Sequence, residues 1–175
     1  NKLHICEDLE EKEKNVRPIL EREKSLTIHI TNRCNLNCPY CYKDANRNSK
    51  ELSKGDILRI VEEASQIGFC EFTFSGGEPT LHPDIFDILE ILSEKYPEHK
   101  LNLITNGTTD LSDYAIDVMV KTLFAIQISV DSADEEINRK TRGIDSVQKI
   151  KVLSQRLAQR GYKKFYFACV PYTSG

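Results

Sequence analysis

The sequence lacks a hydrophobic run long enough to cross a bilayer, which takes about 18 or more consecutive apolar residues. The longest candidate, residues 118–130, is interrupted by Lys121 and Gln127. The first residues also lack the apolar segment that marks a secretory signal. These two absences predict a chain that does not interact with a membrane.

A strong excess of positive charge is also missing. The formal net charge is −3 and the pI is about 5.9, so no broad basic surface for nucleic acid is expected. The chain has 175 residues, of which 39% are hydrophobic, and this suits one domain with a sizeable core. Six cysteines could suggest secretion, but three are clustered and three are scattered, so a reducing cytoplasm is expected.

The clustered cysteines are Cys34, Cys38 and Cys41, with the spacing C-x3-C-x2-C. Residues 25–31 alternate apolar and polar side chains just before them, which predicts a strand. The cysteines would then lie on a loop at the carboxyl end of that strand, where α/β folds bind ligands. Three thiolates from one loop can hold three irons of a [4Fe–4S] cube. The fourth iron would stay open for a substrate or cofactor.

Other interpretations of these cysteines stay open. A structural zinc site would need a fourth ligand, for which His29 and His82 are the nearest in sequence. Cys38 and Cys41 form a C-x-x-C pair, which could make the protein a thiol–disulfide oxidoreductase similar to glutaredoxin. A non-catalytic metal-binding module and three unrelated buried thiols are further alternatives. The scattered Cys70 and Cys169 fall in predicted strands and are expected in the core.

Hydrophobic periodicity predicts five strands that alternate with four helices. Such alternation is typical of a parallel α/β sheet, and right-handed crossovers would curl it. A charged leader is expected at residues 1–24 and one core domain at residues 25–175. The expected strands cover residues 25–31, 69–74, 100–105, 123–131 and 164–170, and the expected helices residues 53–68, 84–95, 112–121 and 145–160.

Three further motifs follow the ends of predicted strands. The run Ser-Gly-Gly-Glu-Pro at residues 75–79 combines two glycines, which permit close approach of a ligand, with a carboxylate suited to an ammonium ion. Asn106-Gly107 ends the third strand as a common turn signal. The run Ser-Val-Asp-Ser at residues 129–132 ends the fourth strand, and Arg142-Gly143 follows it. Arg139 is the alternative to Arg142 as the arginine of this motif.

The cysteine spacing, an aromatic residue before the last cysteine and these three motifs in this order resemble the radical S-adenosylmethionine (radical SAM) superfamily. The resemblance covers about residues 25–170 and implies a partial (β/α)6 barrel similar to a TIM barrel. About five of its units are present, so the chain is expected to stop before the sixth. The residues after the fourth strand look most like the branch of the family that modifies peptides or activates enzymes.

The resemblance also implies two cofactors, a [4Fe–4S] cluster and S-adenosylmethionine. A reduced cluster would split S-adenosylmethionine into methionine and a 5′-deoxyadenosyl radical, which abstracts hydrogen from a substrate. By this resemblance Cys34, Cys38 and Cys41 hold the cluster, and no residue is assigned as a catalytic acid or base. The residues expected at S-adenosylmethionine are Tyr40, Gly76, Gly77, Glu78, Asn106, Ser129 and Arg142, with the carboxylate of the cofactor paired to Arg142.

The expected partners follow from the same resemblance. The substrate would be a peptide, a protein or a small molecule. An external electron donor such as flavodoxin or ferredoxin would reduce the cluster.

Overall fold

The computed structural model describes residues 24–41 and 50–170. The expected leader at residues 1–24 therefore lies outside the described residues, apart from Lys24. In the described part of the chain, no helix is both long enough and apolar enough to cross a membrane.

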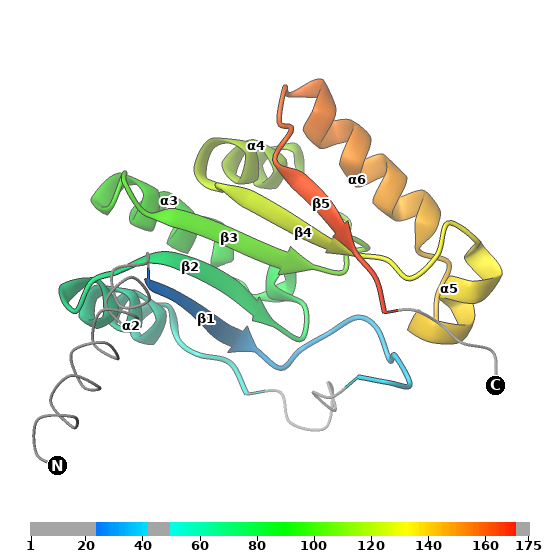
Figure 1. The fold of residues 1–175 in the computed structure, drawn as a ribbon, viewed down its shortest axis with the longest axis horizontal. Helices are drawn as coiled ribbons and strands as arrows, with labels where there is room; N and C mark the ends of the chain where they lie inside the picture. The colour runs from blue at the N-terminus through cyan, green and yellow to red at the C-terminus, as the bar shows by residue number, and fades with distance from the viewer. Residues whose placement is uncertain (1–23, 42–49, 171–175) are drawn as a thin grey trace, which may run out of the picture.

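A single five-stranded sheet organises the molecule, with all strands parallel and in the order β1-β2-β3-β4-β5 (Figure 1). This confirms the predicted α/β class, in the form of a partial barrel. Each strand pairs with the next one along the chain, which is the arrangement that successive strand–helix units produce. The strands are β1 (Lys24–Thr31), β2 (Phe69–Gly76), β3 (Lys100–Thr105), β4 (Ala125–Ser129) and β5 (Phe165–Ala168).

Four helices connect the strands and follow one another along one side of the sheet (Figure 1). They are α2 (Lys54–Gln66), α3 (Ile85–Lys95), α4 (Asp113–Thr122) and α6 (Val147–Gln159). Ser53 and Ser112 cap α2 and α4, because their side chains accept hydrogen bonds from backbone N–H groups of the first turn. All four helices match the periodicity of the sequence to within a few residues.

The hydrophobic core lies between the sheet and these helices. Alternate strand residues point toward the helices and are buried, as the two-residue period of a strand requires. On the strands they are Ile28, Ile30, Phe72, Phe74, Leu101, Leu103, Ile126 and Ile128, which pack in one cluster with helix residues such as Ile57, Ile88, Ile116 and Leu153.

The opposite face of the sheet is largely polar. Its side chains include Thr73, Asn102 and Gln127, which alternate with the buried positions along three neighbouring strands. Asn102 Nδ2 donates to Glu71 Oε1 at 2.8 Å, and Tyr166 Oη donates to Gln127 Oε1 at 3.3 Å. Parallel sheets are usually apolar on both faces, so the polar face distinguishes this sheet from one that is covered by helices on both sides.

Two short helices complete the described structure: the 3-10 helix η1 (Pro79–Leu81) and α5 (Glu135–Arg142). The side chain of Asp134 caps the start of α5, and Gly143 ends it with φ of +81°, a left-handed conformation that favours glycine. Both helices follow the carboxyl ends of strands. The segments after β1, β2, β3 and β4 therefore gather at the same edge of the sheet.

Candidate functional site

The cysteine loop follows β1 at this edge of the sheet. Cys34 and Cys38 are partly buried, Cys41 is exposed, and all three are free thiols. The N–H of Cys41 donates to the carbonyl of Cys38 at 3.0 Å, which closes a turn between the second and third thiols. The buried Leu36 anchors the middle of the loop. The predicted cluster ligands therefore lie together on one short, structured loop.

The charges of the three thiols on the loop interact with one another. Burial raises the pKa of Cys34, and the negative charges of Glu78 and, to a smaller extent, Cys41 add to that rise. Burial also raises the pKa of Cys38, where the nearby Arg142 guanidinium acts in the opposite direction. Negative thiolates on one short loop repel each other, so a cationic metal centre would stabilise all three together.

No group of three Cys, His, Asp or Glu side chains within residues 24–41 and 50–170 could hold a single metal ion. His82, one of the two alternatives for a fourth zinc ligand, uses both ring nitrogens in hydrogen bonds to backbone. Its Nε2 lies 2.8 Å from Leu52 O, and its Nδ1 accepts from the N–H of Asp84 at 3.2 Å. The other alternative, His29, is exposed on β1. Of the scattered cysteines, Cys70 is partly buried on β2, whereas Cys169 is exposed, so the prediction of a core position was wrong for Cys169.

The glycine pair after β2 packs directly against the start of the cysteine loop. The N–H of Gly77 donates to Thr31 O and the N–H of Glu78 donates to Arg33 O, both at 2.7 Å. A Cβ on Gly76 would lie 2.2 Å from Thr31 O, and a Cβ on Gly77 would lie 2.2 Å from Arg33 O. Only glycine fits at either position. The two glycines therefore bring the backbones of the two loops into contact.

Glu78 lies at the centre of the site and is fully buried. Its Oε1 accepts from Thr80 N at 3.1 Å, from Thr80 Oγ1 at 2.6 Å and from Thr105 Oγ1 at 2.7 Å. Its Oε2 accepts from the N–H of Asn106 at 2.7 Å. Burial raises the pKa of Glu78, although these donors favour the charged form. The carboxylate thus ties the ends of β2 and β3 together.

Asn106 joins the end of β3 to the cysteine loop. Its Nδ2 donates to Asn35 Oδ1 at 2.9 Å. The same Nδ2 also donates to Cys34 Sγ at 3.8 Å. Its Oδ1 accepts from Thr108 N at 2.9 Å and from Thr108 Oγ1 at 2.7 Å. The predicted residue Asn106 is therefore in contact with a predicted cluster ligand.

A second polar cluster joins the far end of the cysteine loop to β4 and α5. Tyr40 Oη donates to Asp131 Oδ2 at 2.6 Å, and Arg142 Nη2 pairs with Asp131 Oδ1 at 2.8 Å. The Asp131 side chain is fully buried, and hydrogen bonds from Arg142 and Tyr40 help to lower its pKa against the opposing effect of burial. Cys38 Sγ donates to the carbonyl of Arg142 at 3.8 Å. The buried Nε of Arg142 has no hydrogen-bond partner in the structure.

The remaining predicted residue, Ser129, is half-buried at the end of β4, two residues before Asp131. The rival Arg139 is directed elsewhere, since it pairs with Asp145 at 2.6 Å. Sequence reasoning gave no role to Asp131, Asn35 or Thr108. Asp131 lay within a motif that was singled out, whereas the roles of Asn35 and Thr108 depend on contacts between distant parts of the chain.

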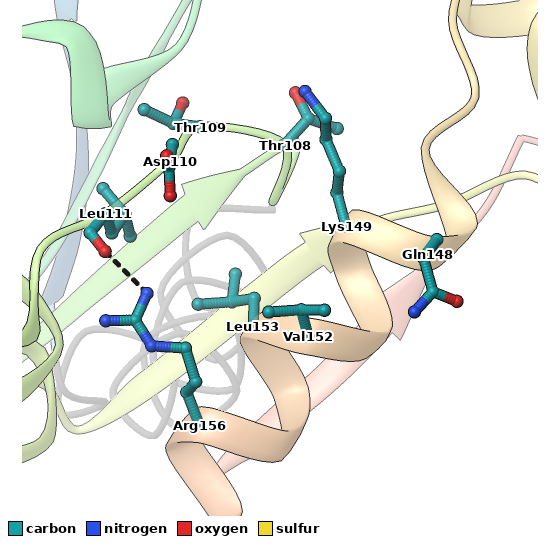
Figure 2. Close-up of a pocket in the computed structure, with 9 residues that line it drawn as sticks. All are labelled: Thr108, Thr109, Asp110, Leu111, Gln148, Lys149, Val152, Leu153 and Arg156. Atoms are coloured by element: carbon teal, nitrogen blue, oxygen red, sulfur yellow. Dashed lines mark hydrogen bonds between the residues drawn. The ribbon is translucent and has the colours of Figure 1, made fainter.

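A small cavity lies next to the site, between the loop after β3 and helix α6. It has a volume of about 230 Å³ and lies between residues 108–111 and one face of α6 (Figure 2). Arg156 spans it and donates to the carbonyl of Leu111 at 2.6 Å. Thr108 lines this cavity and also bonds to Asn106, so it connects the two regions.

Comparison with known proteins identifies a family. The model described as the radical SAM superfamily matches residues 28–173. A "Probable GTP 3′,8-cyclase" of Methanopyrus kandleri is 35% identical over 127 residues, which are 71% of this chain and 40% of that protein. The GTP 3′,8-cyclase of Clostridium perfringens is 33% identical over 130 residues, which are 71% of this chain and 40% of that protein. The chain thus spans about two fifths of the length of these curated relatives.

Solved structures show the same fold. Streptococcus suis SuiB bound to S-adenosylmethionine superposes with a TM-score of 0.76 at 24% identity, over 97% of this chain and 40% of that chain. Native anSMEcpe with bound AdoMet and the Cp18Cys peptide superposes with a TM-score of 0.69 at 25% identity, over 83% of this chain and 42% of that chain.

Proposed function

Because the chain belongs to the radical SAM superfamily, we propose that it forms the core of an enzyme that cleaves S-adenosylmethionine reductively and abstracts hydrogen from a substrate. The family uses a [4Fe–4S] cluster and S-adenosylmethionine as cofactors. The observation that carries the proposal is the single loop of three free thiols at the carboxyl edge of the sheet. We assign residues 25–175 to this core domain.

The donor set of the loop suits an iron–sulfur cluster. Three soft thiolates are the ligands that iron–sulfur centres prefer, and no fourth cysteine lies on the loop. We assign Cys34, Cys38 and Cys41 as its ligands. The amide of Asn106 supplies a hydrogen-bond donor to Cys34, the kind of outer contact that stabilises a thiolate ligand.

The residues around the loop also suit S-adenosylmethionine. Arg142 holds a buried N–H that has no partner among the described residues, and an unpaired guanidinium N–H is a donor for a carboxylate. We assign Arg142, Ser129 and Tyr40 to the β4 side of this cofactor. We assign Gly76, Gly77, Glu78 and Asn106 to its β2 and β3 side.

Cys34, Cys38 and Cys41 would hold a cluster that, once reduced, would supply the one electron needed to split S-adenosylmethionine into methionine and a 5′-deoxyadenosyl radical. The residues of the protein itself hold the loops and strand ends around the cofactor site in place. Gly76 and Gly77 hold the two loops in backbone contact, and Glu78 keeps the strand ends in register. Asp131 binds both Tyr40, at the far end of the cysteine loop, and Arg142 at the end of α5. An external electron donor such as flavodoxin or ferredoxin would deliver the electron.

Two classes of substrate are candidates. The relatives described above are named for GTP, which favours a purine nucleotide. A peptide is favoured by the fold neighbour anSMEcpe, which was crystallised with one, and by the sequence resemblance to peptide-modifying enzymes. The polar open face of the sheet, with Asn102, Gln127 and Glu71, suits hydrogen-bonding groups of either class. The two relatives named for GTP share more than 30% of their residues with this chain, whereas anSMEcpe shares 25%. We therefore favour GTP.

Anaerobic reconstitution with iron and sulfide, followed by an assay for 5′-deoxyadenosine with dithionite as reductant, tests the proposal. We expect a cluster in the wild type and its loss in Cys38→Ser. The matched control Cys70→Ser removes a thiol on β2 that lies outside the loop, and it should retain the cluster. GTP and a cysteine-containing peptide are added in parallel, and the true substrate class should increase 5′-deoxyadenosine formation.

The alternatives give different results. A thiol–disulfide oxidoreductase would bind no iron, would depend on Cys38 and Cys41 and would tolerate Cys34→Ser. A non-catalytic metal-binding module would bind a cluster and release no 5′-deoxyadenosine under any condition. Either result would contradict the proposal.

A further inference from the structure

Three side chains form a closed ring of hydrogen bonds beside the first cysteine. Asn106 Nδ2 donates to Asn35 Oδ1 at 2.9 Å, and Asn35 Nδ2 donates to Thr108 Oγ1 at 2.9 Å. Thr108 Oγ1 then donates to Asn106 Oδ1 at 2.7 Å. Each member therefore donates one hydrogen bond and accepts one within the ring. We call Asn35, Asn106 and Thr108 the amide clamp.

The backbone fixes the direction of this ring. An asparagine amide can in principle be turned over, because its oxygen and nitrogen have similar shapes. At Asn106 the N–H of Thr108 also donates to Oδ1 at 2.9 Å. That backbone group can only donate, so the oxygen of Asn106 must face Thr108. Its Nδ2 must then face the cysteine loop, where Cys34 Sγ lies at 3.8 Å.

The clamp links parts of the chain that are far apart in sequence. Asn35 directly follows Cys34 on the loop after β1, whereas Asn106 and Thr108 follow β3. Asn106 is itself anchored, because its backbone N–H donates to the buried carboxylate of Glu78 at 2.7 Å. Figure 2 shows Thr108 on the loop that faces α6. The first part of the cysteine loop is thus hydrogen-bonded to the segment that follows β3, which is itself bonded to Glu78.

We propose that the amide clamp positions Cys34 before any cluster binds, and that the Asn106 amide then donates to the Cys34 sulfur in the loaded protein. Asn35, Asn106 and Thr108 are positioning residues, since they act through Cys34. The inference rests on the proposed function only in taking Cys34 as a cluster ligand. Holding one ligand in place reduces the ordering that cluster binding requires, and donors to ligand sulfurs raise the reduction potential of iron–sulfur clusters.

The first test uses the cluster-free chain and measures alkylation by iodoacetamide at Cys34 and Cys41, by mass spectrometry of the peptides. Thr108→Val removes one hydroxyl from the ring and keeps the side-chain shape. The matched control is Thr122→Val, in which the lost hydroxyl donates to Val118 O at the end of α4. Asn106→Leu is a second variant that removes the amide itself.

We expect the ratio of Cys34 to Cys41 alkylation to rise at least about fivefold in Thr108→Val, because the hydroxyl makes two of the three ring hydrogen bonds and the loss of even one typically has an effect of this size. Thr122→Val should leave the ratio at the wild-type value. An unchanged ratio in Thr108→Val, or an equal acceleration at both cysteines, would overturn the clamp. Should Asn106→Leu fail to fold, Thr108→Val decides alone.

The second test measures the midpoint potential of the reconstituted cluster by a redox titration followed with electron paramagnetic resonance. Asn106→Leu removes the donor to Cys34, so the potential should fall below the wild-type value. Thr108→Val keeps the backbone contact that orients Asn106, and its potential should fall less. Equal potentials in all three proteins would refute the donor role of Asn106. If the wild type takes up no cluster, the proposed function fails, whereas the alkylation ratio still decides for or against the clamp.

Discussion

Cys41 differs from the other two thiols of its loop because it is exposed, whereas Cys34 and Cys38 are partly buried. Burial raises the pKa of both Cys34 and Cys38, so less of each is present as the reactive thiolate at neutral pH. We predict that a limiting amount of iodoacetamide modifies Cys41 first in the cluster-free chain. Raising the pH should then accelerate Cys34 and Cys38, as peptide mass spectrometry can show. Equal rates at all three thiols at neutral pH would contradict the structure of the loop.

Glu78 should make the stability of the protein depend on pH. Burial raises its pKa in the folded state above the ordinary value of 4.5, so the folded protein binds this proton more tightly than the unfolded chain. The stability from this group is therefore fully present below the unfolded pKa and is lost as the pH rises through the folded pKa. Over that window the loss approaches about 1.4 kcal/mol per pH unit.

We predict that Glu78→Gln lacks this pH dependence. Its single carbonyl also cannot replace both carboxylate oxygens, and its amide would face the N–H of Asn106, so the variant should be less stable than the wild type by about 1–3 kcal/mol near pH 4. This difference should narrow as the pH rises, because only the wild type loses stability through Glu78. Urea unfolding measured at several pH values above about pH 4 gives both quantities. Parallel pH profiles for the two proteins would show that the carboxylate does not titrate as described.

Local patterns in the sequence mark the candidate site residues, but they do not mark the residues that hold these candidates in place. Three cysteines in eight positions and a Gly-Gly-Glu run are visible without a fold. Asn35 and Thr108 are 73 positions apart, and Tyr40 and Asp131 are 91 positions apart, so no local pattern could pair them. Only strand order brings these residues to one edge.

At the scale of elements, the contact between the loops after β1 and β2 requires a glycine at position 77. A Cβ there would lie 2.2 Å from Arg33 O and 2.7 Å from Arg33 C. We predict that Gly77→Ala destabilises the protein by about 1–3 kcal/mol, because backbone must move to admit the methyl group. Thermal and urea unfolding measure this change.

Gly55→Ala is the matched control for that variant. Gly55 lies in the first turn of α2, and a Cβ there would meet only Ser53 Oγ at 3.8 Å, an ordinary contact distance. Alanine should stabilise the helix by about 0.4–1 kcal/mol by restricting the unfolded chain. A similar loss of stability in both variants would mean that the close contact at Gly77 does not exist.

The strands and long helices follow from periodicity, but the short elements do not. Helix α5 has the sequence Glu-Glu-Ile-Asn-Arg-Lys-Thr-Arg, with one apolar residue, so hydrophobic periodicity cannot mark it. The Asp134 cap, Gly143 and the pair of Glu136 with Lys140 at 2.8 Å define it instead. Strand β4 is shorter than predicted, because the chain leaves the sheet after Ser129 toward Asp131 and α5.

At the scale of the whole molecule, one edge of the sheet collects all the predicted site residues. Parallel strands in sequential order place every strand–helix loop at the same edge. The alternation of strands and helices in the sequence therefore determines both the fold and the edge at which these residues lie. The predicted fold class is confirmed, and it places these residues at one edge, whereas their roles in the site stay predictions. The polar open face is not predicted, because alternating polar residues on a strand read equally well as solvent-exposed.

Binding of S-adenosylmethionine should stabilise the molecule only when the cluster is present. A ligand that binds the folded state alone, at a concentration of about 100 Kd, adds about 2.7 kcal/mol to the free energy of unfolding. For a chain of this size we therefore expect a rise in Tm of about 5–10 °C in the reconstituted wild type, measured anaerobically. Cys34→Ser removes one of the three proposed cluster ligands and leaves Arg142 and Asp131 in place, so its Tm should not respond to S-adenosylmethionine. An equal rise in both proteins would mean that the cofactor binds through side chains alone, and that the open iron contributes nothing to its affinity.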